Sequence, residues 1–237
     1  MFNSYVSATR WGLLRKKYAV GTLIAVQVMF AFALFWGIPM IAGPGYKTDS
    51  ATILGVWHLG VLAVGLTLAP QIACEAKNEG YFIFLTNYPI SRFGIFCSEI
   101  ISWLIISIPG LLVTPLLGAA KFGSFADFPS IWSFLLIFAA EFFYLCIGVG
   151  IALCFRLEIV QILSQFLIMF AMLFTPILFP LANLPDFLKI THQILPFEPV
   201  QRILTGSETG SLFFLITPVL WFAVAVFAGV RALGERK

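Results

Sequence analysis

Residues 72–99 read IACEAKNEGYFIFLTNYPISRFGIFCSE and separate two long uncharged runs of the chain. The stretch holds five of the 25 charged residues of the sequence, namely Glu75, Lys77, Glu79, Arg92 and Glu99. It also contains two turn signals, at Gly80 and at Pro89. In a chain that is mostly apolar, this stretch is the best candidate for contact with a soluble partner.

The composition excludes an ordinary water-soluble domain. The 237 residues are 60% hydrophobic and only 11% charged, whereas soluble domains have about 25% charged residues. No polar stretch approaches the roughly 50 residues of the smallest domains. We therefore expect a single all-α integral membrane domain over residues 1–237.

Six apolar runs are long enough for membrane spans, which need roughly 20 residues each. We expect the spans at residues 18–42, 50–74, 100–120, 129–155, 159–181 and 209–230. Residues 3–17 precede them and predict an amphipathic helix at the membrane surface, or alternatively a disordered basic tail. The charged and anchoring residues of this interfacial helix are Arg10, Trp11, Arg15, Lys16 and Lys17.

Lysine and arginine counts predict the orientation. Segments on the N-terminal side of the membrane carry ten of these residues, and those on the other side carry four. Because basic residues concentrate in cytoplasmic loops, we expect a multi-pass protein of the plasma (inner) membrane with both termini in the cytoplasm. Residues 75–92 then form a cytoplasmic loop, and residues 182–206 lie outside.

The outer passage, residues 182–206, predicts two short helices. Pro185 stands beside residues that favour a helix start, and apolar side chains recur at helical spacing until Pro196 stops that helix. A second helix over residues 200–204 can be capped by Gly206. Neither is long enough to span, so we expect a re-entrant outer hairpin before the sixth span, with a surface loop as the alternative.

The order of these features resembles the membrane subunits of type-2 ABC exporters, the permease class that includes daunorubicin, nodulation-factor and O-antigen exporters. The inner loop matches the family pattern at Glu75, Glu79, Gly80, Leu85, Pro89, Ile90, Ser91 and Arg92. The outer passage matches the family's re-entrant hairpin at Pro180, Pro185, Pro196 and Arg202. The chain departs from the pattern at Tyr81, where threonine is usual, and at Glu99, near where lysine is frequent.

This resemblance implies a permease that pairs with a second permease, identical or related, and with two ATPase subunits that bind ATP and Mg. The ATPase-coupling residues would be Glu75, Lys77, Glu79, Gly80, Pro89, Arg92 and Arg156. Independently, the sequence has no G-x-x-x-x-G-K-[ST] phosphate loop, so ATP hydrolysis is expected in a partner chain. We expect no cofactor, metal or catalytic residue in this chain, and membrane lipid but no nucleic acid among its partners.

Polar residues inside the predicted spans are candidates for the translocation path. Glu141 lies near the middle of the fourth span, where a carboxylate costs about 3 kcal/mol to insert. It can contact the path or a coupling interface, or it can be a structural glutamate between helices. Gln161 and Gln165, four residues apart, can line the path or hold helices together. His58 is expected to form hydrogen bonds between helices.

Glu75 and Glu79 are also four residues apart and share one helix face, with Lys77 on the other side. They can dock on basic groups of an ATPase or form an ordinary solvated loop. Arg156 can form a second, smaller contact or an interfacial anchor.

Two other classes of function are open to a chain of this kind. A passive channel or secondary carrier is the main alternative, although carriers often show broken helices in both halves, and here the hairpin follows only the fifth span. An intramembrane enzyme is less favoured, because the sequence has no H-E-x-x-H motif.

Overall fold

A computed structural model of the chain describes residues 2–37, 39–40, 50–122, 130–174, 194–206 and 212–234. The described residues form helices and turns and contain no strand, which confirms the predicted all-α class. Four helices are long and apolar enough to cross a membrane, which identifies a membrane protein: Ala19–Gly37, Ile53–Asn78, Arg92–Lys121 and Ile131–Cys154. Leu157–Met172 and Ile216–Ala232 are apolar but shorter, so six spans stay a prediction.

The helices follow the predicted order with some different bounds. The elements are α1 (Phe2–Lys16), α2 (Ala19–Phe32), the π-helical η1 (Ala33–Gly37), α4 (Ser50–Ala63), the π-helical η2 (Val64–Leu68), α5 (Ala69–Asn78), α6 (Tyr81–Thr86), α7 (Arg92–Phe122), α8 (Ile131–Cys154), α9 (Leu157–Phe174), α11 (Phe197–Thr205) and α12 (Leu212–Ala232). The predicted third span begins at Ile100, but α7 already begins at Arg92. Ser91 explains this start, because its hydroxyl accepts a hydrogen bond from the Gly94 amide at 3.1 Å and so caps the helix.

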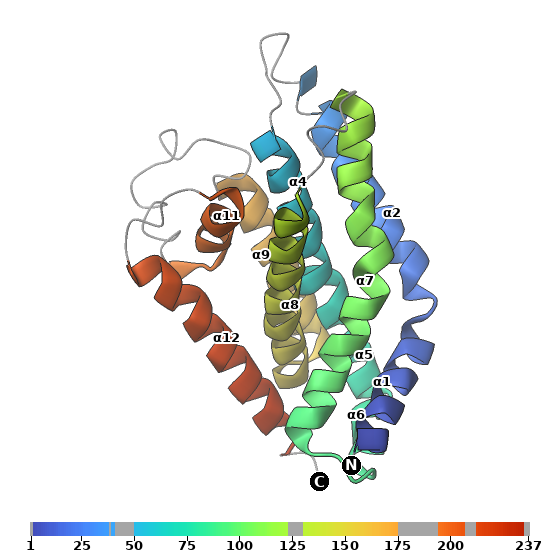
Figure 1. Cartoon of the computed structure of the whole chain (residues 1–237). Coiled ribbons are helices and arrows are strands. Elements are labelled where there is room, and N and C mark those ends of the chain that lie inside the picture. Colours follow the sequence, from blue (N-terminus) through green and yellow to red (C-terminus); the bar gives the residue numbers. More distant parts are fainter. Residues whose placement is uncertain are drawn as a thin grey trace.

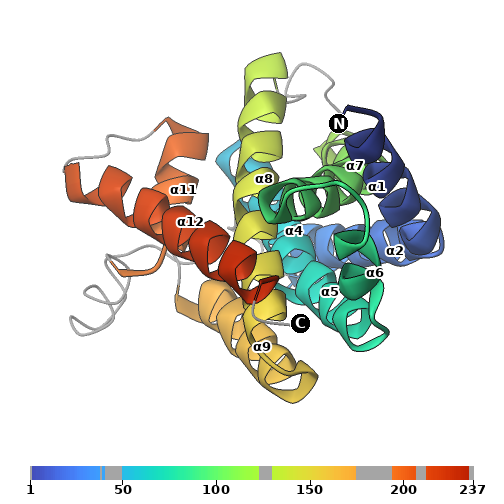
Figure 2. The same cartoon turned by 90° about the horizontal axis from the view of Figure 1, so that it is seen from below.

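Helix α8 is the centre of the bundle. It contacts α4, η2, α5, α7, α9, α11 and α12. Seen along the bundle, α12 lies on one side of α8, and α1, α2 and α7 lie on the other (Figure 2). Gly148 allows backbone-level contact, because a Cβ there would collide with the Gly65 carbonyl oxygen of η2. Such small residues let membrane helices approach closely.

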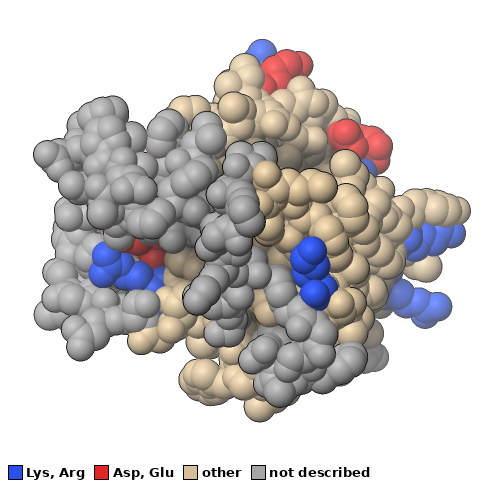
Figure 3. Space-filling model, turned by 90° about the horizontal axis from the view of Figure 1, so that it is seen from above, with Lys and Arg blue, Asp and Glu red and all other residues tan. Residues whose placement is uncertain are grey.

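One end of the bundle, here called the α1 end, gathers segments from across the sequence. Helices α1 and α6 and the last turn of α12 all lie there (Figure 1). Ala8, Gly12 and Lys16, spaced one turn apart, are buried where α1 packs against α7. At the opposite end of the bundle, charged atoms are sparse on the described surface (Figure 3).

Candidate functional site at the α1 end

The polar stretch, residues 72–99, folds into the end of α5, the short helix α6 and the start of α7. Helix α5 ends at Asn78, Gly80 takes the left-handed conformation with φ 79°, and α6 follows over Tyr81–Thr86. A left-handed backbone strongly favours glycine, which is why the chain can turn here. The two turn signals at Gly80 and Pro89 thus lie on either side of a short helix.

Helix α6 carries apolar side chains both toward the bundle and outward. Phe82 and Leu85 are buried in the bundle, whereas Ile83 and Phe84 are exposed. Trp11 of α1, also exposed, packs edge-on against Phe84 with 6.2 Å between ring centroids. Five exposed residues at this end are called the α6 surface: Trp11, Glu75, Glu79, Ile83 and Phe84.

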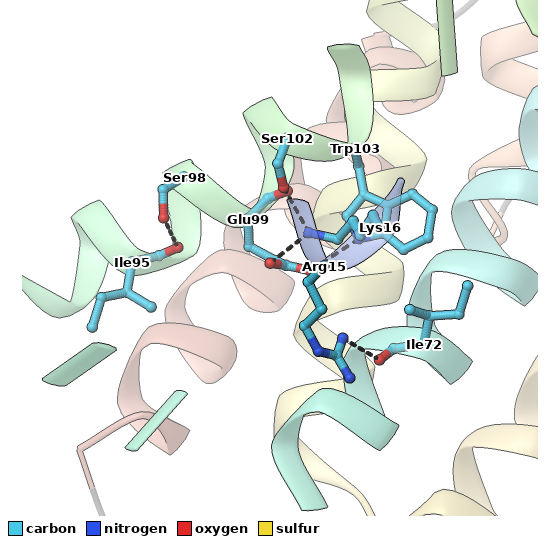
Figure 4. A network of polar contacts seen from close by, with 8 residues as sticks. All are labelled: Arg15, Lys16, Ile72, Ile95, Ser98, Glu99, Ser102 and Trp103. Carbon is cyan, nitrogen blue, oxygen red and sulfur yellow. Dashed lines mark hydrogen bonds and ion pairs between the residues drawn. The ribbon is translucent and has the colours of Figure 1, made fainter. Parts of the chain in front are cut away.

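Lys16 anchors α1 to α7 through a buried ion pair (Figure 4). Its Nζ lies 2.8 Å from Glu99 Oε2, with both side chains 1% exposed, and donates to Ser102 Oγ at 2.6 Å. Trp103 Nε1 donates to Glu99 Oε1 at 3.0 Å, and its ring lies 5.3 Å from the ammonium. Burial lowers the pKa of Lys16, and the attraction of Glu99 opposes this only in part. Lys16 is thus not the surface anchor that we predicted, because its partner on α7 holds it inside.

Arg15 joins α1 to the loop that carries α6. Its guanidinium donates to Glu79 Oε2 at 2.6 Å and to the Ile72 carbonyl at 3.5 Å, and it lies 5.5 Å from the centre of the Tyr81 ring. Burial raises the pKa of Tyr81, Glu99 raises it further, and Arg15 lowers it. Residues 15 and 16 therefore hold two different helices to α1.

Lys77 lies inside the bundle rather than on the α6 surface. Its ammonium donates to the Ala152 carbonyl at 2.5 Å and to the Phe155 carbonyl. These carbonyls belong to the C-terminal end of α8, where backbone oxygens lack helical partners and a cation is favoured. Lys77 therefore connects α5 to α8, and its burial removes it from the surface where the predicted ATPase-coupling residues would act.

The other predicted coupling and interfacial residues are dispersed at the α1 end. Arg92 is exposed at the first position of α7, and its guanidinium lies against Gly234 beyond the end of α12. Arg156 is exposed in the turn between α8 and α9. Arg10 and Lys17 are exposed on and just after α1, where Lys17 stacks on Tyr18 at 4.7 Å.

A second polar cluster connects α4, α8 and α11 within the bundle. His58 is fully buried, with Nδ1 2.6 Å from Gln201 Oε1 and Nε2 2.6 Å from the Tyr144 hydroxyl. The prediction that His58 bonds between helices is confirmed. Tyr144 and Gln201 were missed, since no local pattern sets them apart from packing residues.

Glu141 lies one turn from Tyr144 on α8 and is fully buried. Among the described residues, neither carboxyl oxygen has a hydrogen-bond partner. The hydroxyl of Ser107 on α7 lies near the Glu141 carboxyl, but it donates its hydrogen bond to the Leu104 carbonyl at 3.0 Å. In contrast, Gln161 and Gln165 are exposed on α9.

The predicted outer hairpin is described only in its second half. Pro185 and the predicted first helix lie outside the described residues, apart from its last positions. Pro196 precedes α11, which is longer than the predicted helix over residues 200–204 and ends at Gly206 with φ 67°, as expected. Arg202 pairs with Glu198 one turn earlier at 2.7 Å.

A comparison with models of known protein families finds no match to this chain, and a comparison with curated proteins finds no match either.

Proposed function

We propose that this chain is the permease subunit of an ATP-driven exporter, forming half of a translocation path and coupling to separate ATPase subunits. The observation that carries the proposal is the α6 surface, which projects from the α1 end on a short helix. Exposed Ile83 and Phe84 beside the carboxylates of Glu75 and Glu79 suit a protein partner with an apolar pocket and a basic rim.

The contacts behind α6 support a role in transmitting force. Arg15 ties Glu79, at the turn before α6, to α1, and Lys77 ties α5, which leads into that turn, to the end of α8. A push on α6 would therefore reach the central helix through packed side chains and hydrogen bonds rather than through a loose tether. In the orientation that we propose, this end faces the cytoplasm, where an ATPase would dock.

Helix α9 supports pairing with a second permease. Glu158, Gln161 and Gln165 follow one another at helical spacing on its exposed surface. Polar side chains that face hydrocarbon are costly, so membrane proteins turn them toward protein or water. A second permease, identical or related, or a path between the two, would cover this stripe.

The test is co-purification from native membranes. An affinity-tagged chain should carry an ATPase with it, and the complex should hydrolyse ATP. Phe84→Asp should release the ATPase, because it places a charge in the centre of the contact, whereas Val219→Asn, at an exposed position of α12 away from the α1 end, should retain it. Retention by Phe84→Asp, or transport by the purified chain with no nucleotide-binding partner, would contradict the proposal and favour a channel or secondary carrier.

A further inference from the structure

An apolar groove runs between α7 and α12, with α8 behind it. Near the α1 end it encloses about 490 Å³, and it continues into a hollow of about 180 Å³. Phe93, Phe222 and Val226 line both parts, so the two form one continuous groove. Figure 1 shows α12 diverging from α7 with distance from the α1 end.

The groove exists because α12 packs more closely on α8 than on α7. A Cβ on Gly150 would lie 2.6 Å from the Ala225 carbonyl oxygen, and one on Gly229 would lie 3.1 Å from the Gly150 Cα. This close contact between α8 and α12 leaves larger side chains, among them Phe142 and Phe222 with centroids 6.0 Å apart, to form the walls.

Charge is confined to one end of the groove. Arg92, at the start of α7, and Arg231, in the last turn of α12, both line its mouth at the α1 end. Of the residues that the structure describes, none of the others that line either part is charged. A guanidinium binds phosphate through paired N–H groups and is more weakly hydrated than an ammonium, which suits it to an anion at a membrane surface.

The length of the groove matches one leaflet. From Arg92 to Ile101, the lining residue of α7 that is farthest from the α1 end, the helix rises about 13.5 Å at 1.5 Å per residue. The hydrocarbon of one leaflet is about 15 Å thick, half of a bilayer core. An occupant with an anionic head at the arginines and an apolar chain along Phe93 and Phe222 would therefore fill it.

We propose that this groove binds a phospholipid with an anionic headgroup from the leaflet at the α1 end. A second protein copy suits the groove less well, because another apolar helix would offer no anionic group to the two guanidinium groups at its mouth. A soluble anion would leave the apolar length unfilled. This site requires only the chain and its bilayer, so it is independent of the exporter proposal.

The test is native mass spectrometry of the purified chain with added phosphatidylglycerol or phosphatidylcholine. Phosphatidylglycerol should be retained in preference to phosphatidylcholine. Each arginine near an anionic surface contributes about fivefold in affinity, so the double variant Arg92→Gln, Arg231→Gln should bind phosphatidylglycerol about 25-fold more weakly. Arg156→Gln removes an exposed arginine from the same end but outside the groove, and it should leave the preference unchanged.

A second variant separates the chain-binding part of the groove from its charge. Val226→Trp should fill the groove and lower retention of the lipid while both arginines stay in place. Equal retention of the two lipids, or equal losses from the double variant and from Arg156→Gln, would overturn the proposal. So would full retention of phosphatidylglycerol by Val226→Trp.

Discussion

Replacing Lys16 by methionine would leave the Glu99 carboxyl buried without its counter-charge. At 2.8 Å and an effective dielectric constant of about 20, the two charges attract by about 6 kcal/mol. Desolvation of each ion costs several kcal/mol, so the pair itself stabilises the fold little. Removing one partner is different, and we expect Lys16→Met to lower the free energy of unfolding by about 3–5 kcal/mol.

The assay is a double-mutant cycle on the purified chain, unfolded with SDS in mixed micelles and followed by far-UV circular dichroism. Lys16→Met with Glu99→Leu removes both charges, and it should recover most of the stability that the single variant loses. The matched control is the neighbouring pair of Arg15 and Glu79, 2.6 Å apart with side chains 23% and 66% exposed. Water screens that pair, so its coupling should be about 0.2–1 kcal/mol.

Two results would refute this reasoning. One is a cost below about 1 kcal/mol for Lys16→Met, within the range of an exposed pair. The other is a coupling energy between Lys16 and Glu99 no larger than that between Arg15 and Glu79. Either would mean that the Lys16 ammonium reaches water when α1 is in its native position.

Three further substitutions test other contacts. Because the pKa of Tyr81 is raised, the folded chain keeps the phenol proton above pH 10 while the unfolded chain loses it, and stability should fall as pH rises past about 10. In unfolding measurements across this pH range, Tyr81→Phe should reduce the slope of that fall by up to about 1.4 kcal/mol per pH unit. Lys77→Met should lower the free energy of unfolding by about 1–3 kcal/mol, because it leaves buried carbonyls of α8 unpaired. The surface control Glu75→Gln should change it by less than about 0.5 kcal/mol, and equal effects of the two in thermal unfolding would contradict this reasoning. Gly148→Ala should cost about 1–3 kcal/mol, because its Cβ collides with backbone, and an unchanged melting temperature would show that α8 can shift.

Turn chemistry is the part of this fold that the sequence predicts best. Gly80, expected at a turn, and Gly206, expected as a helix cap, both take the left-handed conformation. These signals are local, since the residue itself restricts its own backbone angles. Hydropathy likewise locates the apolar runs, although the helix that begins at Arg92 extends beyond the run that indicated it.

The buried lysines could not be placed from the sequence. A lysine near the end of a span can extend toward water or bind a partner inside, and its neighbours in sequence fit both outcomes. The atoms that decide it are distant: Ser102 lies 86 positions from Lys16, and Ala152 lies 75 positions from Lys77. The Tyr144–His58–Gln201 cluster is hidden for the same reason, because its members come from three helices.

The π-helical segment η2 sets the angular phase of the second long helix. His58 and Lys77 both contact α8, yet nineteen positions separate them. At about 100° per residue, an uninterrupted α-helix would carry these two side chains about 100° out of alignment. A single π-turn absorbs one extra residue, which removes that offset and turns both toward α8. Deleting one residue of Val64–Leu68 would therefore rotate the two halves of this helix about 100° relative to each other. The bundle could then keep either the His58 contact or the Lys77 contact with α8, but not both.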